Sequence, residues 1–343
     1  MSTFIIAEAG VNHNGSAERA LEMVTVAARC GADAVKFQTF SADRLVKPGS
    51  AKAEYQKRET GEGDQHSMLQ ALEMSPELHR KLIDRCHECG IEFMSTPFDE
   101  DAALFLKKIG MKTLKVPSGE ITNFPFLRFL TSLETPMILS TGMSELAEVE
   151  AAISCIREAA VRQGRPPLGH NELKILHCTS NYPAAAVDVN LRAMVEMGDR
   201  LGFPVGYSDH TLGIAVSTAA VAMGAVVIEK HFTLDRSLPG PDHRASLTPD
   251  ELAALVDQIR TVELSLGSPV KAPAPSELAV RQLVRRSIFA ARDIESDTAI
   301  QMPDLEMLRP ADGISPSEID KVEGRKTKRR IAAGQMIRWD DLS

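Results

Sequence analysis

One unit recurs along most of this chain: a short apolar segment ending in polar or small residues, then a longer segment with helical periodicity. It occurs eight times between Phe4 and about Leu264. Such apolar runs predict buried strands, and their alternation with helices predicts a parallel sheet. An open doubly wound sheet usually has fewer strands and a glycine-rich nucleotide loop, and neither GxGxxG nor GxxxxGK[ST] occurs here. The pattern therefore predicts a (β/α)8 TIM barrel, class α/β. The eight predicted strands are FIIAEAG, AVKFQTF, EFMSTPF, TLKVPSGE, PMILSTG, LKILHCTS, PVGYSDHT and VVIEKHFT.

Helix signals and insertions fit the same barrel. Ala17–Cys30 and Pro76–Cys89 are predicted helices, the second with Ser75 as N-cap and a proline at its first position. Two longer insertions, residues 41–75 and 234–248, follow the second and the eighth predicted strand. Loops after strand C-termini form the functional face of a barrel, so we expect both insertions to lie at its mouth.

A second, smaller domain follows a linker rich in Pro and Ala. We predict a barrel over residues 1–266, a linker over 267–280 and a small domain over 281–343. Arg292–Leu305 aligns without a gap onto Arg329–Leu342 at a constant offset of 37 residues. This internal repeat, with its many turns, predicts a compact β-rich module with pseudo-symmetry. A domain of this size can bury only a small hydrophobic core, so packing against another protein surface would stabilise it.

Composition narrows the class of protein. The chain has 343 residues, 43% of them hydrophobic and 25% charged, with a net charge of −8. This balance indicates a globular protein and disfavours nucleic acid as a partner. The sequence has no apolar run of about 18 residues and no signal-peptide pattern, so we expect a cytoplasmic protein without a membrane segment. The five cysteines are predicted to be free thiols.

Charged residues occupy inward positions of three predicted strands. Because strand side chains alternate between faces, Lys36 points into the barrel if its apolar neighbours contact the helices. Lys115 and Glu8 follow the same rule. An unpaired buried charge costs several kcal/mol. Two explanations remain open for any one residue: an internal ion pair, such as Glu8 with Lys36, or a site for an anionic ligand. Polar groups at six of the eight strand ends favour the ligand site.

Two histidines lie at matching depth on the seventh and eighth strands. His210 shares a face with Ser208, and His231 shares one with Glu229. Neighbouring strands lie about 4.8 Å apart, so both imidazoles can reach one divalent ion. Two imidazoles with open positions suit Mn²⁺, Fe²⁺, Co²⁺ or Zn²⁺ better than Ca²⁺. Asp209 has the opposite parity, so it is predicted to point away from the metal and to orient the metal-binding side chains.

This set of groups predicts a reaction class. Buried lysines and the hydroxyls of Thr96, Ser118 and Ser208 suit a phosphate or a carboxylate. A metal suits a carbonyl oxygen. Together they indicate carbon–carbon bond formation between a phosphorylated enol and an aldehyde. A Schiff-base aldolase is the second candidate, but Lys230 faces outward by parity and the sixth strand has no lysine near its end.

Nine motifs, in order, resemble one enzyme family. They are AEAGVNHNG, KFQTF, STPFD, KVPSGE, LHCTSNYP, GYSDHT, EKHFT, PGPDHRASL and LRPADG. The chain resembles the sialic acid synthase family, the phosphoenolpyruvate-dependent synthases of N-acetylneuraminate, legionaminate and pseudaminate, over essentially its whole length. Its small domain resembles the antifreeze-like (SAF) domain of these enzymes.

The resemblance implies a transferase that condenses phosphoenolpyruvate with an N-acetylated amino sugar and water, and releases phosphate by C–O cleavage. It implies Mn²⁺, with Mg²⁺ or Co²⁺ as alternatives, on His210 and His231, and roles in proton transfer or near the metal for Glu120 and Glu8. The implied phosphoenolpyruvate contacts are Lys36, Thr96, Lys115, Ser118 and Ser208, with Ser180 or Asn181 at a further phosphate position. The implied sugar contacts are Gln38, Tyr182, Asp242 and Arg309. In the family, this arginine belongs to the partner's SAF domain, which caps the barrel in a domain-swapped homodimer.

The acceptor sugar is the least determined part of the prediction. We expect N-acetylmannosamine, giving N-acetylneuraminate, and keep legionaminate synthesis from 2,4-diacetamido-2,4,6-trideoxymannose as the alternative. PGPDH fits both better than it fits pseudaminate synthesis. A non-catalytic ice-binding or saccharide-binding protein is a remoter alternative that leaves Lys36 and Lys115 unexplained.

Overall fold

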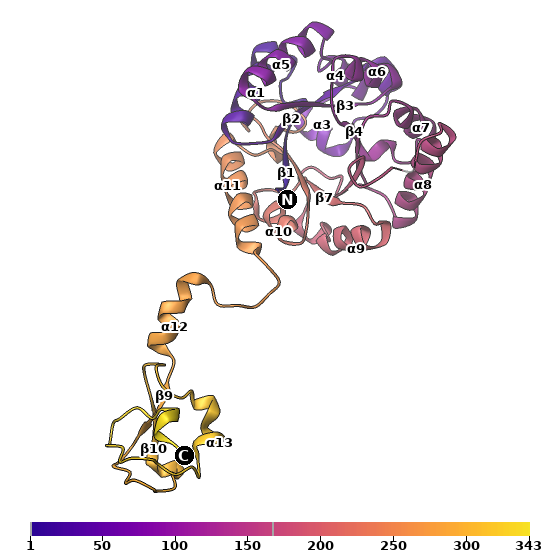
Figure 1. Cartoon of the computed structure of the whole chain (residues 1–343). Helices are drawn as coiled ribbons and strands as arrows, with labels where there is room; N and C mark the ends of the chain where they lie inside the picture. Colours follow the sequence, from indigo (N-terminus) through magenta and orange to yellow (C-terminus); the bar gives the residue numbers. More distant parts are fainter. Residues whose placement is uncertain (1, 167) are drawn as a thin grey trace. The chain divides into compact units, whose positions relative to one another are not determined.

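Eight parallel strands form the centre of the first of two compact units, Met1–Gly267 (Figure 1). The structure is a computed structural model that describes residues 2–166 and 168–343. The strand order is β3-β2-β1-β8-β7-β6-β5-β4, and the end strands β3 and β4 contact each other, so the sheet closes. The predicted (β/α)8 barrel is confirmed. The strands are β1 (Phe4–Gly10), β2 (Ala34–Thr39), β3 (Glu92–Pro97), β4 (Leu114–Val116), β5 (Met137–Ser140), β6 (Leu173–Cys178), β7 (Val205–Asp209) and β8 (Val227–His231).

A helix of at least eight residues follows each strand along the chain, and these helices surround the strands (Figure 1). They are α1 (Ala17–Arg29), α5 (Pro76–Cys89), α6 (Glu100–Lys108), α7 (Phe124–Ser132), α8 (Leu146–Arg162), α9 (Leu191–Leu201), α10 (Ala215–Ala222) and α11 (Pro249–Leu266). The predicted cap of α5 is confirmed, since the Ser75 hydroxyl accepts a hydrogen bond from the Leu78 amide. Across the described residues, no helix combines the length and the apolar character needed to cross a membrane.

Strand parity divides the barrel into an apolar shell and a layered interior. Outward side chains such as Val35 and Phe37 pack with the helices in the main core. Inward side chains near the start of the strands fill the bottom of the barrel: Ile6, Ala34, Met94, Ile138, Leu176 and Val227. The next inward positions, two residues further along each strand, are mostly polar. This apolar plug therefore forms the floor on which the polar layer rests.

Two insertions extend the C-terminal ends of the strands. Residues 41–75 fold into three short helices, α2 (Ala42–Leu45), α3 (Glu54–Thr60) and α4 (Gln65–Gln70). The loop after β8 contains one turn of 3₁₀ helix, His243–Ala245. The Asn12 amide donates to the Phe232 carbonyl (2.8 Å), and the Asn14 amide donates to the Pro239 carbonyl (2.6 Å). The β1–α1 loop thus holds the loop after β8 in place.

The second unit, Ser268–Ser343, has its own small core. Its elements are α12 (Leu278–Val284), β9 (Ser287–Ala290), β10 (Leu305–Leu308) and α13 (Ile319–Val322), and β9 pairs with β10 in antiparallel fashion. The predicted repeat is visible in the structure. Ile294 and Ile331, which are 37 residues apart, exchange backbone hydrogen bonds of 2.8 and 2.9 Å. Arg292 pairs with Asp304 as Arg329 pairs with Asp341. Helix α12, partly inside the predicted linker, was not predicted.

Candidate active site

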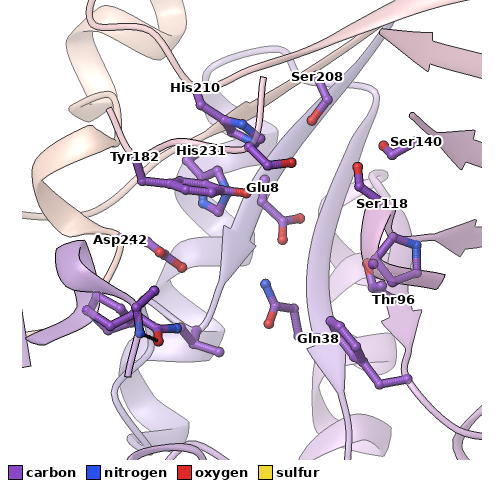
Figure 2. Close-up of a pocket in the computed structure, with 18 of the residues that line it drawn as sticks. Glu8, Gln38, Thr96, Ser118, Ser140, Tyr182, Ser208, His210, His231 and Asp242 are labelled. Atoms are coloured by element: carbon purple, nitrogen blue, oxygen red, sulfur yellow. Dashed lines mark hydrogen bonds between the residues drawn. The ribbon is translucent and has the colours of Figure 1, made fainter. Parts of the chain in front are cut away.

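A cavity of about 460 Å³ opens where the eight strands end. In Figure 2, Thr96, Ser118 and Ser140 lie on one side, and Tyr182 and Asp242 lie on the other. The strand ends meet here because all eight strands are parallel, so side chains distant in sequence converge. Every strand contributes at least one lining residue: Glu8, Lys36, Thr96, Lys115, Ser140, Cys178, Ser208 and Glu229.

Two lysines and two glutamates form a buried ion network in this cavity. Lys36 Nζ lies 2.6 Å from Glu8 Oε2 and 3.6 Å from Glu229 Oε2, and Lys115 Nζ lies 3.2 Å from Glu229 Oε1. All four side chains are at most 6% exposed. The internal ion pair Glu8–Lys36 therefore exists, and it lies within a ligand-sized cavity. Of the two explanations left open by the sequence, the ion pair is confirmed, and the site for an anionic ligand stays a prediction.

Burial and the neighbouring charges shift the pKa of three members of the network: Glu229, Glu8 and Lys36. Burial opposes ionisation of Glu229, but Lys115 and Lys36 outweigh it and hold the pKa of this carboxyl at about 2. Burial raises the pKa of Glu8 to about 7, although Lys36 opposes this rise. Desolvation disfavours the Lys36 ammonium, yet Glu229 and Glu8 keep its pKa above the usual value. Lys36 is thus a stable cation able to meet an anion.

Hydroxyl groups and one backbone amide surround the lysines. Lys36 Nζ donates to Thr96 Oγ1 (3.0 Å), and Ser208 Oγ donates to Glu229 Oε1 (3.0 Å). The Gly142 amide donates to Ser118 Oγ (2.9 Å). A Cβ atom on Gly142 would clash with Ser180 Oγ, Cys178 Sγ and Ser118 Oγ in their present positions. Small donors beside two ammonium groups suit a phosphate or a carboxylate.

The two predicted metal ligands lie side by side under an aromatic ring. The rings of His210 and His231 have centroids 5.6 Å apart, and the ring of Tyr182 lies 4.1 Å from that of His210. His210 Nδ1 lies 2.7 Å from the Thr179 carbonyl oxygen, an acceptor only, so Nδ1 carries the proton and Nε2 keeps its lone pair. Burial lowers the pKa of His210 to about 4 and that of His231 well below its usual value. Both rings are therefore neutral and able to act as ligands.

The residues present fit a metal held by two histidines. His231 Nδ1 is buried and has no hydrogen-bond partner among the described residues. Gly10 (φ 52°) lies beside the ring, and a Cβ at this position would approach Glu8 Oε1 and His231 Cε1 to 3.3 Å. Within the described part of the chain, no three His, Cys, Asp or Glu side chains are grouped to hold an ion. An ion on two imidazoles would take its other ligands from water or substrate, which matches the open coordination of catalytic metals.

The loop after β8 and the insertion close the far side of the cavity. Asp242 is buried, and desolvation raises its pKa to about 6. The ring of Tyr55, from α3, stacks on that of Tyr182 with centroids 5.1 Å apart. Gln38 Nε2 would lie 3.5 Å from a Cβ on Gly10. Predicted sugar contacts Gln38, Tyr182 and Asp242 thus line the cavity.

Some predicted site residues lie elsewhere. Glu120 does not line the cavity, and its carboxylate accepts a hydrogen bond from the Asn123 amide (2.7 Å) in an exposed position. Ser118–Glu120 forms a 3₁₀ turn beyond the end of β4, and its first two residues line the cavity. The predicted role of Glu120 in proton transfer stays a prediction. Asn181 is exposed, while Ser180 lines the cavity. Arg309 is exposed in the second unit.

Asp209 and Lys230 face away from the cavity, as their parity predicts. Lys230 Nζ lies 2.9 Å from Asp209 Oδ2, and both side chains are fully buried behind the barrel wall. Asp209 also accepts hydrogen bonds from Thr211 and Ser217. The three consecutive residues Ser208, Asp209 and His210 therefore have different roles. Ser208 and His210 face the cavity, and Asp209 belongs to a structural ion pair.

Glu229 and Ser140 line the cavity but were not predicted as site residues. Glu229 has the same parity as His231, two residues later, and this parity was sufficient to place it inside. Ser140 Oγ is buried without a hydrogen-bond partner among the described residues and lines the cavity. Ser140 ends the apolar run Met137–Ser140, so its inward position was also readable from the strand.

Comparison with known proteins identifies the family. Residues 23–271 match the NeuB family, and residues 285–343 match the SAF domain. The chain belongs to the NeuB family. This NeuB-family chain is 51% identical over 346 residues to the N,N'-diacetyllegionaminic acid synthase of Legionella pneumophila, covering 100% of this chain and 95% of the relative. The N,N'-diacetyllegionaminic acid synthase of Campylobacter jejuni is 43% identical, with 98% and 99% covered.

A solved structure supports the same assignment. The N-acetylneuraminic acid synthetase of Leptospira borgpetersenii is 34% identical and matches with a TM-score of 0.69, covering 82% of this chain and 90% of that one. The family predicted from the nine sequence motifs is confirmed, together with the barrel and SAF domain. NeuB-family synthases are enzymes that condense phosphoenolpyruvate with sugars.

Proposed function

We propose that this chain condenses phosphoenolpyruvate with 2,4-diacetamido-2,4,6-trideoxymannose and water, giving N,N'-diacetyllegionaminate and phosphate. The names of the two relatives at 51% and 43% identity favour this acceptor over N-acetylmannosamine, which the sequence analysis preferred. The single observation that carries the reaction class is the pair of buried lysines among hydroxyl donors beside two neutral histidines.

The donor occupies the lysine side of the cavity. Lys36 and Lys115 pair with its phosphate and carboxylate, and Ser118, Ser180 and the Gly142 amide surround the anion. In the reaction, C3 of phosphoenolpyruvate forms a bond to the aldehyde carbon of the acceptor. Water then adds at C2, and the C2–O bond to phosphate breaks. Preorganised cations stabilise the charge that develops on the leaving phosphate.

His210 and His231 would hold a divalent ion, for which we propose Mn²⁺. When bound, this ion supplies Lewis-acid polarisation of the acceptor carbonyl. The Thr179 carbonyl fixes His210 in the tautomer that presents Nε2. Tyr182, whose ring lies 4.1 Å from that of His210, and Asp242 orient the sugar chain from the other side.

A Schiff-base aldolase fits this cavity less well. Such an enzyme needs a lysine of lowered pKa that can attack a carbonyl. Lys36 has a raised pKa, and Lys115 pairs with Glu229. Lys230 has a lowered pKa, caused by burial, but it lies behind the wall with Asp209. No cavity lysine of the described barrel therefore has the required environment.

Phosphate release from phosphoenolpyruvate tests the proposal. The acceptor panel is N-acetylmannosamine, its 6-phosphate and 2,4-diacetamido-2,4,6-trideoxymannose. We expect the highest kcat/KM with the last, abolition of activity by EDTA and recovery with Mn²⁺. Full activity in metal-free enzyme would refute the metal role, and covalent trapping by borohydride would instead support the aldolase. No phosphate release with any acceptor would favour a non-catalytic saccharide-binding protein.

The SAF unit completes the site in this proposal. Arg309 reaches the sugar from the SAF unit of the partner subunit in a domain-swapped homodimer. Its exposed position and the exposed stretch of residues 267–280 are compatible with such an exchange. The enzyme is proposed to act in the cytoplasm, where its phosphorylated donor is made.

A further inference from the structure

One wall of the active-site cavity is apolar. Five cavity-lining residues pack with Phe40 into a small hydrophobic cluster separate from the main core: Val11, Leu45, Leu69, Leu72 and Phe98. Leu45, Leu69 and Leu72 belong to the insertion, residues 41–75. The aromatic rings of Phe40 and Phe98 meet edge to face at 5.9 Å, which anchors the cluster to the ends of β2 and β3. We call these five residues the apolar wall.

The insertion presents no cation to the cavity. Its other lining residues are Val46, Ala53, Tyr55, Gln56, Gln65 and Met68. Two of its polar groups bind each other, since Gln65 Nε2 donates to Gln56 Oε1 (3.3 Å). Gln56 Oε1 also accepts from the Ala53 amide (3.0 Å). Few hydrogen-bonding groups on this side of the cavity are free to meet a hydroxyl, and none is suited to a phosphate.

The position of the reaction fixes which end of the acceptor meets the apolar wall. The aldehyde carbon must lie beside the lysine-held donor and the two histidines. The polar side of the cavity is then filled by phosphoenolpyruvate. An open-chain hexose reacting at C1 has C6 at its opposite end, and the space left for that end is bounded by the insertion.

We infer that the apolar wall holds the C6 methyl of a 6-deoxy acceptor, and that Leu69 is a specificity-determining residue for this position. The inference rests on the proposed function and adds to it the group that the site selects. A C6 hydroxyl placed against these five side chains would lose its water, and none of the five side chains has a group that could form a hydrogen bond with it. Apolar pockets discriminate against an added hydroxyl by about 100-fold at most. We therefore expect a 10- to 100-fold preference for the 6-deoxy acceptor.

Two acceptors that differ only at C6 test this inference. They are 2,4-diacetamido-2,4,6-trideoxymannose and 2,4-diacetamido-2,4-dideoxymannose, which keeps its C6 hydroxyl. The ratio of their kcat/KM values is measured for the full-length enzyme and for Leu69→Asn, in which a carboxamide replaces the branched alkyl group. We expect the ratio to fall at least fivefold in the variant. The matched control is Leu104→Asn, a leucine on α6 that is 47% exposed and outside the cavity.

A second variant guards against a folding defect in the first. Val46→Thr keeps the side-chain shape and places a hydroxyl on the same side of the cavity. It should lower the ratio in the same direction, and Leu104→Asn should leave it unchanged.

The outcomes separate this inference from the proposed function. If the enzyme releases phosphate but the two acceptors react equally well, or if both cavity variants keep the wild-type ratio, the apolar wall does not select C6 and the inference is wrong. If the enzyme releases no phosphate with any acceptor, the proposed function itself fails.

Discussion

Glu229 sets the charge of the cavity, because this one carboxylate lies within 3.6 Å of both buried lysines. Without a ligand, Lys36 pairs with Glu8 and Glu229, and Lys115 pairs with Glu229. An arriving anion therefore meets cations that are already charged and oriented, and it must displace carboxylates from them. Such preorganisation lowers the reorganisation needed when the reaction begins.

Asp242 predicts a pH dependence at a single residue. Its folded-state pKa is raised from 3.8 to about 6 by burial. The folded protein holds this proton more tightly than the unfolded chain, so the stabilisation is complete below pH 3.8 and is lost as the pH rises through about 6. Asp242→Asn cannot titrate. Urea unfolding should therefore show the variant gaining about 2 kcal/mol relative to wild type between pH 4.5 and 7.5. The same difference at both pH values would contradict the burial argument.

Residue parity explains what the sequence could and could not predict at the site. The alternation of strand side chains placed Glu8, Lys36, Lys115, Ser208, His210 and His231 inside correctly. The same rule placed Glu229 on the face of His231, but no role in the site was predicted for it. Glu120 was placed by motif alone, and the motif carries no information on how far the turn after β4 departs from the strand direction.

At the scale of the elements, β7 and β8 are joined behind the cavity by the Asp209–Lys230 ion pair. Lys230→Met should remove the cation and leave a buried carboxylate with only hydroxyl and amide donors. Breaking a buried pair in this way costs about 3–5 kcal/mol. The free energy of unfolding in urea measures the loss for the barrel.

The double variant Asp209→Asn, Lys230→Met is the control for this prediction. It removes both charges, so its loss should be clearly smaller than that of Lys230→Met alone. Equal losses would mean that the pair contributes through packing and not through charge.

Element lengths account for the limits of the fold prediction. The eight strands were recognisable because each combines an apolar run with polar residues at its end. The insertion helices α2, α3 and α4 have four to seven residues, and such short helices form through tertiary contacts with the barrel mouth and carry little periodicity of their own. Three of the five residues of the apolar wall, Leu45, Leu69 and Leu72, belong to this unpredicted part, which is why acceptor choice was not readable from the sequence.

At the scale of the whole molecule, the proposed domain swap makes a prediction about mixed dimers. A His210→Ala chain keeps Arg309, and an Arg309→Ala chain keeps both histidines. In a swapped dimer of the two, one barrel has its histidines and receives Arg309 from the other chain. Random exchange should restore roughly a quarter of wild-type activity, since half of the dimers are hybrids with one complete site.

The mixing experiment has a clear opposite outcome. If Arg309 served its own barrel, the mixture would show only the sum of the two weak activities. Light scattering on the mixture establishes whether the chains are dimers. If the purified subunits do not exchange, the two variants are co-expressed with different tags so that the hybrid dimers can be isolated.

The repeat in the SAF unit has a consequence for how that unit holds together. Its buried core draws on both repeats, with Ile294 and Ile300 from the first and Ile331 and Ile337 from the second. Each repeat covers the apolar face of the other, so the unit is equivalent to a dimer of two short segments, Arg292–Leu305 and Arg329–Leu342, joined in one chain. A flexible tether of this kind supplies a local concentration in the millimolar range. The unit therefore assembles by an intramolecular step, and its stability does not depend on how dilute the protein is.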